Sequence, residues 1–137
     1  MLLLDTGPLV ALQDARENHH RWSVEAFGSV SGPVVTCEAV LTEAAFLLRE
    51  WPDAFDLVLE QVEHGRIRVE SLTEDASLVR KLIKKYRSVP MAYADACLVR
   101  LTEKFPRAQL LTLDKGFEVY RRFGRQTIPL LAPFRQR

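Results

Sequence analysis

The sequence predicts an α/β fold: a three-layer α/β/α sandwich around a central parallel sheet of about five strands. Short apolar runs alternate with longer stretches of helical periodicity along the whole chain. Strands that alternate with helices form parallel sheets covered by helices on both faces. The 137 residues, 47% of them hydrophobic, are enough for one domain with its own core. We therefore expect a single domain over residues 1–137, with no linker or repeat.

Five apolar runs, bounded by Gly, Pro, Asp or Ser, are the predicted strands. They cover residues 1–4, 33–36, 66–69, 109–113 and 127–131. The helical patterns cover residues 7–13, 18–28, 37–50, 53–64, 73–87, 92–104 and 115–123. Because crossovers between parallel strands are right-handed, this order leaves few topologies.

Several classes of protein do not fit the sequence. No apolar run approaches the roughly 18 residues of a membrane span, and the first residues lack the basic segment of a signal peptide. The phosphate-binding patterns GxxxxGK[ST] and GxGxxG are absent. Cys37 and Cys97 do not have zinc-site spacing, and we expect them to be buried apolar fillers in a reduced, cytoplasmic protein.

The charges are distributed unevenly along the chain. Residues 1–70 carry 5 Lys or Arg and 12 Asp or Glu, whereas residues 71–137 carry 14 and 6. Such an asymmetry indicates a polyanionic partner for the second part of the chain. It is equally typical of two solvated sets of helix faces that attract each other.

Two acidic residues stand on apolar helical stripes, where an unpaired carboxylate is costly. Asp95 lies in "MAYADACLVR", and its neighbours one helical turn away are Met91, Ala92, Leu98 and Val99. Glu43 lies in "EAVLTEAAFLL", and its neighbours at this spacing are Ala39, Val40, Phe46 and Leu47. The stripes offer no basic partner nearby, although Arg49 or Arg100 is long enough to reach inward.

Two more acids follow predicted strands directly: Asp5 after "MLLL" and Asp114 after "LLTL". The carboxyl ends of parallel strands lie at one edge of a sheet, where ligand sites gather. Each Asp, taken singly, also suits the cap of the following helix. One explanation serves all four acids, namely convergence on a hard divalent cation such as Mg²⁺, which prefers oxygen ligands. Such a site is suited to phosphodiester hydrolysis.

The segments that contain these acids resemble a known family. "LLLDTGPLVAL", "VVTCEAVLTEAAFLL", "MAYADACLV" and "LLTLDKGFEVYRR" are similar to the PilT N-terminus (PIN) domain ribonucleases, in particular the VapC-type toxins of bacterial toxin–antitoxin pairs. The resemblance covers nearly the whole chain. By position it assigns the family's acidic cluster to Asp5, Glu43, Asp95 and Asp114. It assigns the supporting hydroxyls to Thr6 and Thr112.

The resemblance implies a metal-dependent endoribonuclease that hydrolyses RNA with Mg²⁺ or Mn²⁺ bound to the four acids. It also implies a small antitoxin partner and a homodimer. Many members carry a further acid where this chain has Lys115-Gly116, which leaves a second metal position open. The basic stretches 80–87 and 121–125 are candidates for contacts to the RNA backbone, through Arg121, Arg122 and Arg125 in the second stretch.

Two alternatives remain at this point. One is a catalytically weak PIN-like module that binds RNA or an antitoxin without cleavage, and the other is a housekeeping PIN nuclease without an antitoxin. The four intact acids argue against the first. Asp5 as a phosphoryl-accepting nucleophile is disfavoured, because the second acid expected two residues later is missing. His19 and His20 lie apart from the acids and are expected at the surface.

Overall fold

The computed structural model of the protein describes residues 1–135 and contains a five-stranded parallel sheet in the order β3-β2-β1-β4-β7. The last two residues of the predicted unit lie outside the described residues. The strands are β1 (Leu2–Leu4), β2 (Val34–Cys37), β3 (Ile67–Glu70), β4 (Gln109–Leu111) and β7 (Leu130–Leu131). In the central register, Leu3 lies beside Val35 on one side and Leu110 on the other.

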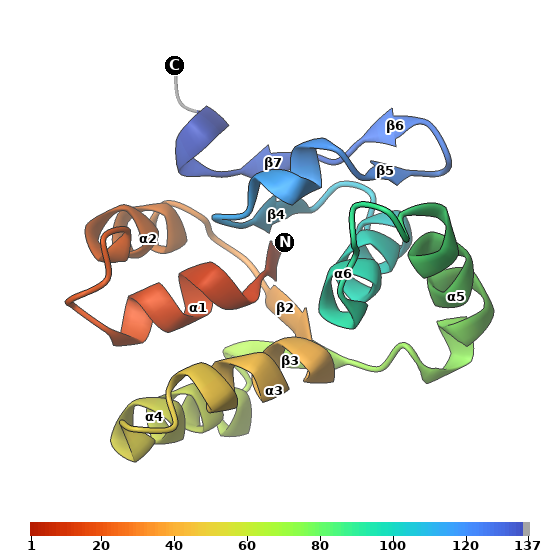
Figure 1. The fold of residues 1–137 in the computed structure, drawn as a ribbon. Coiled ribbons are helices and arrows are strands. Elements are labelled where there is room, and N and C mark those ends of the chain that lie inside the picture. Colours follow the sequence, from red (N-terminus) through yellow and green to blue (C-terminus); the bar gives the residue numbers. More distant parts are fainter. Residues whose placement is uncertain (136–137) are drawn as a thin grey trace.

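Helices cover both faces of this sheet, which confirms the predicted α/β/α sandwich. They are α1 (Thr6–Gln13), α2 (His20–Gly28), α3 (Glu38–Leu47), α4 (Pro52–Glu63), α5 (Ala76–Lys85) and α6 (Tyr93–Lys104). Figure 1 shows α1 and α2 on one side of the sheet and α5 and α6 on the other. Short 3-10 turns complete the chain: η1 (Thr73–Asp75), η2 (Lys115–Glu118) and η3 (Pro133–Arg135). None of the described helices combines the length and apolar character that crossing a membrane requires.

The core sits on both faces of the central strands. Leu2, Leu3 and Leu4 are all fully buried, as expected of a parallel strand covered by helices on each side. Helix α6 contacts β1, β2 and β4, and it buries Leu98, Val99 and Leu101 among other residues. Cys37 and Cys97 are both buried, as the sequence predicted, and they are free cysteines.

The sequence predictions for residues 115–123 and 127–131 were wrong in part. The predicted helix ends with η2, and the chain continues into an antiparallel hairpin of β5 (Arg121–Arg122) and β6 (Gln126–Thr127). The backbone reverses through Phe123 and Gly124, which both have positive φ angles, of 50° and 79°. Only Leu130–Leu131, the end of the predicted fifth strand, joins the main sheet as β7.

The strand order changes direction at β1. From β1 the chain adds β2 and β3 on one side of the sheet, and it returns to add β4 and β7 on the other. In open parallel sheets, ligands bind beyond the carboxyl ends of the strands at such a reversal. Asp5 follows β1 directly, and Asp114 lies three residues after β4 ends, so two of the predicted acids border this position.

Candidate active site

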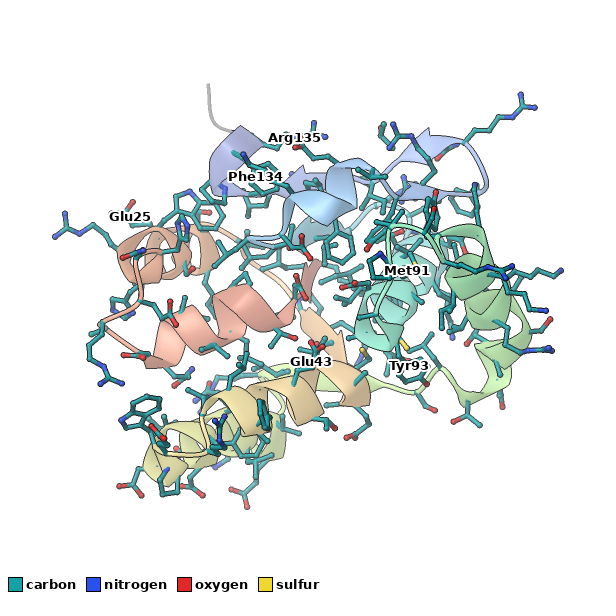
Figure 2. The ribbon with its side chains drawn as sticks, in the orientation of Figure 1. Glu25, Glu43, Met91, Tyr93, Phe134 and Arg135 are labelled. Carbon is teal, nitrogen blue, oxygen red and sulfur yellow. The ribbon has the colours of Figure 1, made fainter. Side chains whose placement is uncertain are left out.

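A cavity of about 900 Å³ lies at the carboxyl ends of β1 and β4, and all four predicted acids line it. The acids come from four elements: Asp5 precedes α1, Glu43 lies on α3, Asp95 on α6, and Asp114 precedes η2. Figure 2 shows Glu43 extending from α3 into the space between α1 and α6. The fold therefore brings together carboxylates that are up to 109 positions apart in the sequence.

Asp5 is the most deeply buried of the four acids and also caps α1. Its Oδ1 accepts from the Thr6 backbone N–H at 2.7 Å, and its Oδ2 accepts from Thr112 Oγ1 at 2.6 Å. Burial raises the pKa of Asp5 to about 7, and the charges of Asp95 and Asp114 act in the same direction, against the lowering effect of the two hydrogen bonds. The side chain is thus held in one orientation in an environment that disfavours its negative charge.

Asp95 is half-buried in the first turn of α6, as its apolar stripe predicted. Its Oδ2 accepts from the Ala92 backbone N–H at 3.0 Å and from the Tyr120 hydroxyl at 3.3 Å. Both partners are neutral. Burial raises the pKa of Asp95, and the charges of Asp114 and Glu43 raise it further, although its two hydrogen bonds lower it.

Glu43 corrects one prediction, because it is exposed rather than buried on an apolar stripe. The face of α3 that packs on the core consists of Val40, Leu41 and Ala44. Phe46, one turn after Glu43, is instead 62% exposed. Glu43 Oε1 accepts from Thr6 Oγ1 at 2.7 Å, so this carboxylate is held beside Asp5 from outside the core.

Thr112 connects two of the acids. Its hydroxyl donates to Asp5 and accepts from the Asp114 backbone N–H at 3.0 Å, while Asp114 Oδ1 accepts from the Gly116 N–H at 2.8 Å. Asp114 is exposed and caps η2. Three of the acids, Asp5, Asp95 and Asp114, therefore fix helix starts and face the cavity at once, so the capping and the site interpretations do not compete.

Among the described residues, no basic side chain neutralises this cluster of acids. Within residues 1–135, every ion pair joins other residues, and none involves Asp5, Glu43, Asp95 or Asp114. His19 and His20 do not line the cavity. An oxygen-only donor set with uncompensated negative charge suits a hard divalent cation.

The carboxylates are not drawn together as in a closed metal site. In the part of the chain that the structure describes, no three Asp, Glu, His or Cys side chains form a group that could hold a metal ion as they stand. Since Mg²⁺ retains several of its waters in proteins, acids that line one cavity can bind it partly through water. The oxygen ligands of the cavity thus fit such an ion, although the four carboxylates stand too far apart to enclose it directly.

Tyr120 is a site residue that the sequence did not reveal. It is buried, and its hydroxyl donates to Asp95 Oδ2. Burial raises the pKa of Tyr120, and the charges of Asp95 and Asp114 add to this effect, so the phenol stays protonated and can donate. One signal was present: a tyrosine on the apolar side of "GFEVY" needs a polar partner for its hydroxyl.

The three arginines predicted to contact RNA differ in whether their guanidinium groups are free to bind a phosphate. Arg122 is buried, and its Nη1 donates to the carbonyl oxygens of Thr102 at 2.8 Å and Pro106 at 3.1 Å, so it fastens the hairpin to the end of α6 and is not free for a phosphate. Arg121 Nη1 donates to backbone carbonyls, of which Glu118 O is nearest at 2.7 Å. Arg125 is exposed.

The family model for the PIN domain matches residues 2–122. The chain belongs to the PIN-domain family. This match runs along the chain from β1 through β5 and includes all four acids, and it confirms the family resemblance that the sequence motifs indicated.

Two proteins similar to this PIN-domain protein, one in sequence and one in fold, come from Mycobacterium tuberculosis. Ribonuclease VapC26 of strain ATCC 25618 / H37Rv is 26% identical over 117 residues, which cover 83% of this chain and 87% of that protein. The crystal structure of VapC20, described as a toxin that cleaves the Sarcin-Ricin loop, superposes with a TM-score of 0.79 at 20% identity and covers 87% of this chain and 94% of that one. The second comparison supports the fold alone.

Proposed function

We propose that this PIN-domain protein is a metal-dependent endoribonuclease, and that residues 1–137 form one functional unit. The observation that carries the proposal is the cavity itself, which four carboxylates line and where none of them forms an ion pair with a basic side chain of residues 1–135. The similarity to a ribonuclease over most of both chains supports RNA as the substrate. Asp5, Glu43, Asp95 and Asp114 would hold Mg²⁺ or Mn²⁺.

A bound divalent cation supplies charge neutralisation at the phosphate and an acidified water. The protein residues keep its ligands in place. Thr112 orients Asp5, Thr6 orients Glu43, and the Tyr120 hydroxyl together with the Ala92 N–H orients Asp95. Such supporting hydrogen bonds typically contribute 10- to 100-fold to metal affinity or activity, to an order of magnitude.

The RNA backbone would bind to a basic surface beside the elements that carry the four acids. Helix α5 and the residues after it expose five cationic side chains: Arg80, Lys81, Lys84, Lys85 and Arg87. Lys85 Nζ donates to the Gly124 carbonyl at 2.9 Å and joins this surface to the hairpin that carries Arg125. The ion pairs of the described residues all lie within residues 1–70 or within residues 71–135, so they do not support mutual attraction of the two parts as the reason for the charge asymmetry.

The VapC-type resemblance extends the proposal to a toxin that pairs with a small antitoxin and forms a homodimer. A short reading frame for a small DNA-binding protein directly upstream would support this extension. Its absence would favour a housekeeping PIN nuclease.

The test of the ribonuclease itself is cleavage of a labelled single-stranded RNA with Mg²⁺ or Mn²⁺, and with excess EDTA. Cleavage should require the metal ion and stop in EDTA. Undiminished cleavage in EDTA would exclude the metal mechanism. RNA binding without cleavage under any of these conditions would instead favour the binding module.

A further inference from the structure

The cavity has more room, and a more apolar wall, than a hydrated metal ion needs. Its volume is about 900 Å³, and Phe46, Leu47 and Leu113 line it together with the four acids. Cavities of about 300–1,000 Å³ with apolar walls and a few polar groups are typical of sites for organic ligands. Metal binding explains the acids in this cavity, but it does not explain the apolar side chains of its wall.

Phe46 is the most exposed large hydrophobic side chain of the described residues, with 62% of its surface accessible. It follows Glu43 by three positions on α3, so both side chains point to the same side of the helix. The aromatic ring therefore stands next to the acids and open to solvent. Its exposure serves no packing purpose within the chain.

Arg49 lies against this ring. Its guanidinium carbon is 4.2 Å from the ring centroid of Phe46, and its Nη1 donates to the Phe46 carbonyl at 2.8 Å. Among residues 1–135, Arg49 has no acidic partner within ion-pair distance. The pair thus offers an exposed aromatic surface with an uncompensated positive charge behind it, at the edge of an acidic site.

A second pair of the same kind provides a comparison. Arg16 lies 4.2 Å from the ring of Trp51, but Arg16 is also paired with Asp14, and Trp51 lines a different cavity. Trp51 is less exposed, at 41%. The same contact therefore occurs away from the acids with its charge neutralised, whereas the charge of Arg49 beside the cavity has no acidic partner among residues 1–135.

We propose that Phe46, backed by Arg49, is a stacking platform for an RNA base next to the phosphate that is cleaved. Every base can stack on an aromatic ring, and single-stranded RNA is commonly recognised in this way. The cation of Arg49 favours a phosphate-bearing ligand over a protein with an apolar surface. This inference rests on the proposed ribonuclease function and names the position where its substrate is held.

The experiment measures binding separately from cleavage. Short single-stranded RNAs, each with one 2-aminopurine at a different position, are titrated against protein carrying Asp95→Asn, and gels verify that the RNA stays intact. Adding Phe46→Ala should raise the dissociation constant about 5- to 150-fold, the usual range for the loss of one base–aromatic stack. It should also abolish the fluorescence quenching at one RNA position.

Phe46→Trp should restore both the affinity and the quenching, whereas the matched control Trp51→Ala should leave both at the parental level. An affinity within about 2-fold of the parent for Phe46→Ala, with quenching unchanged, would overturn the platform. So would a change from dimer to monomer in sedimentation without loss of RNA affinity, because the ring would then belong to a protein interface. If the platform results hold and wild type cleaves no RNA with Mg²⁺ or Mn²⁺, the proposed function fails while the platform stands.

Discussion

Asp95 in α6 and Asp75, which ends η1 and pairs with two side chains of α6, have opposite surroundings. Asp75 accepts from Arg100 Nε at 2.9 Å and from Lys104 Nζ at 3.0 Å. These bonds, that of Lys104 most strongly, lower the pKa of Asp75. Asp95 has only neutral partners, and its pKa is raised by burial. The same residue type thus stabilises the fold in one place and stays uncompensated in the other.

This difference separates structural acids from candidate ligands. The charge of a carboxylate in an ion pair is balanced by a basic side chain, so neutralising the carboxylate removes native interactions. A carboxylate in a cluster of like charges is destabilised in the metal-free protein, and neutralising it relieves repulsion. Perturbed carboxylates in a cavity are typical of functional sites. The two regions should therefore respond in opposite ways to the same substitution.

The largest expected effect is the difference between Asp95→Asn and Asp75→Asn in RNA cleavage and in the response of the melting temperature to Mg²⁺. Asp95→Asn should lower RNA cleavage more than about 100-fold, since removal of groups that only support metal ligands already has effects of 10- to 100-fold. In EDTA its melting temperature should equal or exceed that of wild type, and added Mg²⁺ should no longer raise it. Wild type should gain stability as RT ln(1 + [L]/Kd), about 2.7 kcal/mol at 100 times Kd.

Asp75→Asn is the control. It removes two charge-assisted hydrogen bonds and should lower the free energy of unfolding by about 1.5–3 kcal/mol. Its response to Mg²⁺ and its cleavage, measured well below its melting temperature, should match wild type. If Asp95→Asn were the variant strongly destabilised in EDTA, Asp95 would be a structural residue and the comparison would fail.

Asp5 and Asp75 should also give the free energy of unfolding opposite dependences on pH. Burial first, and then the charges of Asp95 and Asp114, raise the pKa of Asp5 from 3.8 to about 7 in the metal-free protein. The folded state then binds a proton more tightly than the unfolded state. Its contribution to stability is complete below pH 3.8 and is lost as the pH rises towards 7. Asp75, with a lowered pKa, contributes above pH 3.8 and loses its contribution as the pH falls through its lowered pKa.

Urea unfolding in EDTA at about pH 5 and pH 8 measures this effect. The free energy of unfolding of wild type should decrease over this interval by on the order of 2–3 kcal/mol, which is the part of the Asp5 linkage that lies above pH 5. Asp5→Asn should remove most of the decrease, and Asp75→Asn should leave it in place. An equal decrease in wild type and Asp5→Asn would show that other groups produce it.

Much of the fold could be predicted because its signals are local. The strand at 1–4 is an uninterrupted apolar run, and the helix that contains Asp95 follows from the apolar residues one turn to either side. The structure has both elements, as β1 and α6. The meeting of Asp5 and Asp114 at one edge followed from their positions after strands, since parallel strands end on the same side.

What could not be predicted depends on tertiary context. Phe117 and Tyr120 have helical spacing and are both buried, yet the segment is a 3-10 turn that leads into a hairpin. Its reversal uses a positive φ at Phe123, a conformation rare for such a residue and hence invisible in the sequence. Glu43 was misplaced because Phe46 and Leu47 were assumed to pack inward, whereas they line the cavity.

The arginines of the hairpin show a similar difference, because one is hydrogen-bonded within the fold and another is exposed to solvent. Arg122 donates to two backbone carbonyls within the fold, and Arg125 is exposed. RNA binding that releases counterions weakens with salt in proportion to the number of phosphates contacted. Only the exposed arginine should therefore contribute to this dependence.

Arg125→Ala should lower the slope of log affinity against log salt by about 0.7 if Arg125 contacts one phosphate of a single strand, the smallest of the expected effects. Arg122→Ala should leave the slope unchanged and instead reduce the free energy of unfolding by about 1.5–3 kcal/mol, because hydrogen bonds from a charged group are lost inside the fold. Fluorescence anisotropy with one labelled RNA at several salt concentrations, in EDTA, measures the slope for both variants. Since EDTA prevents the proposed metal-dependent cleavage, the slope reports binding alone. A slope that changes for Arg122→Ala but not for Arg125→Ala would mean that the buried arginine reaches the RNA. The distinction between partnered and free charges would then not hold in the hairpin.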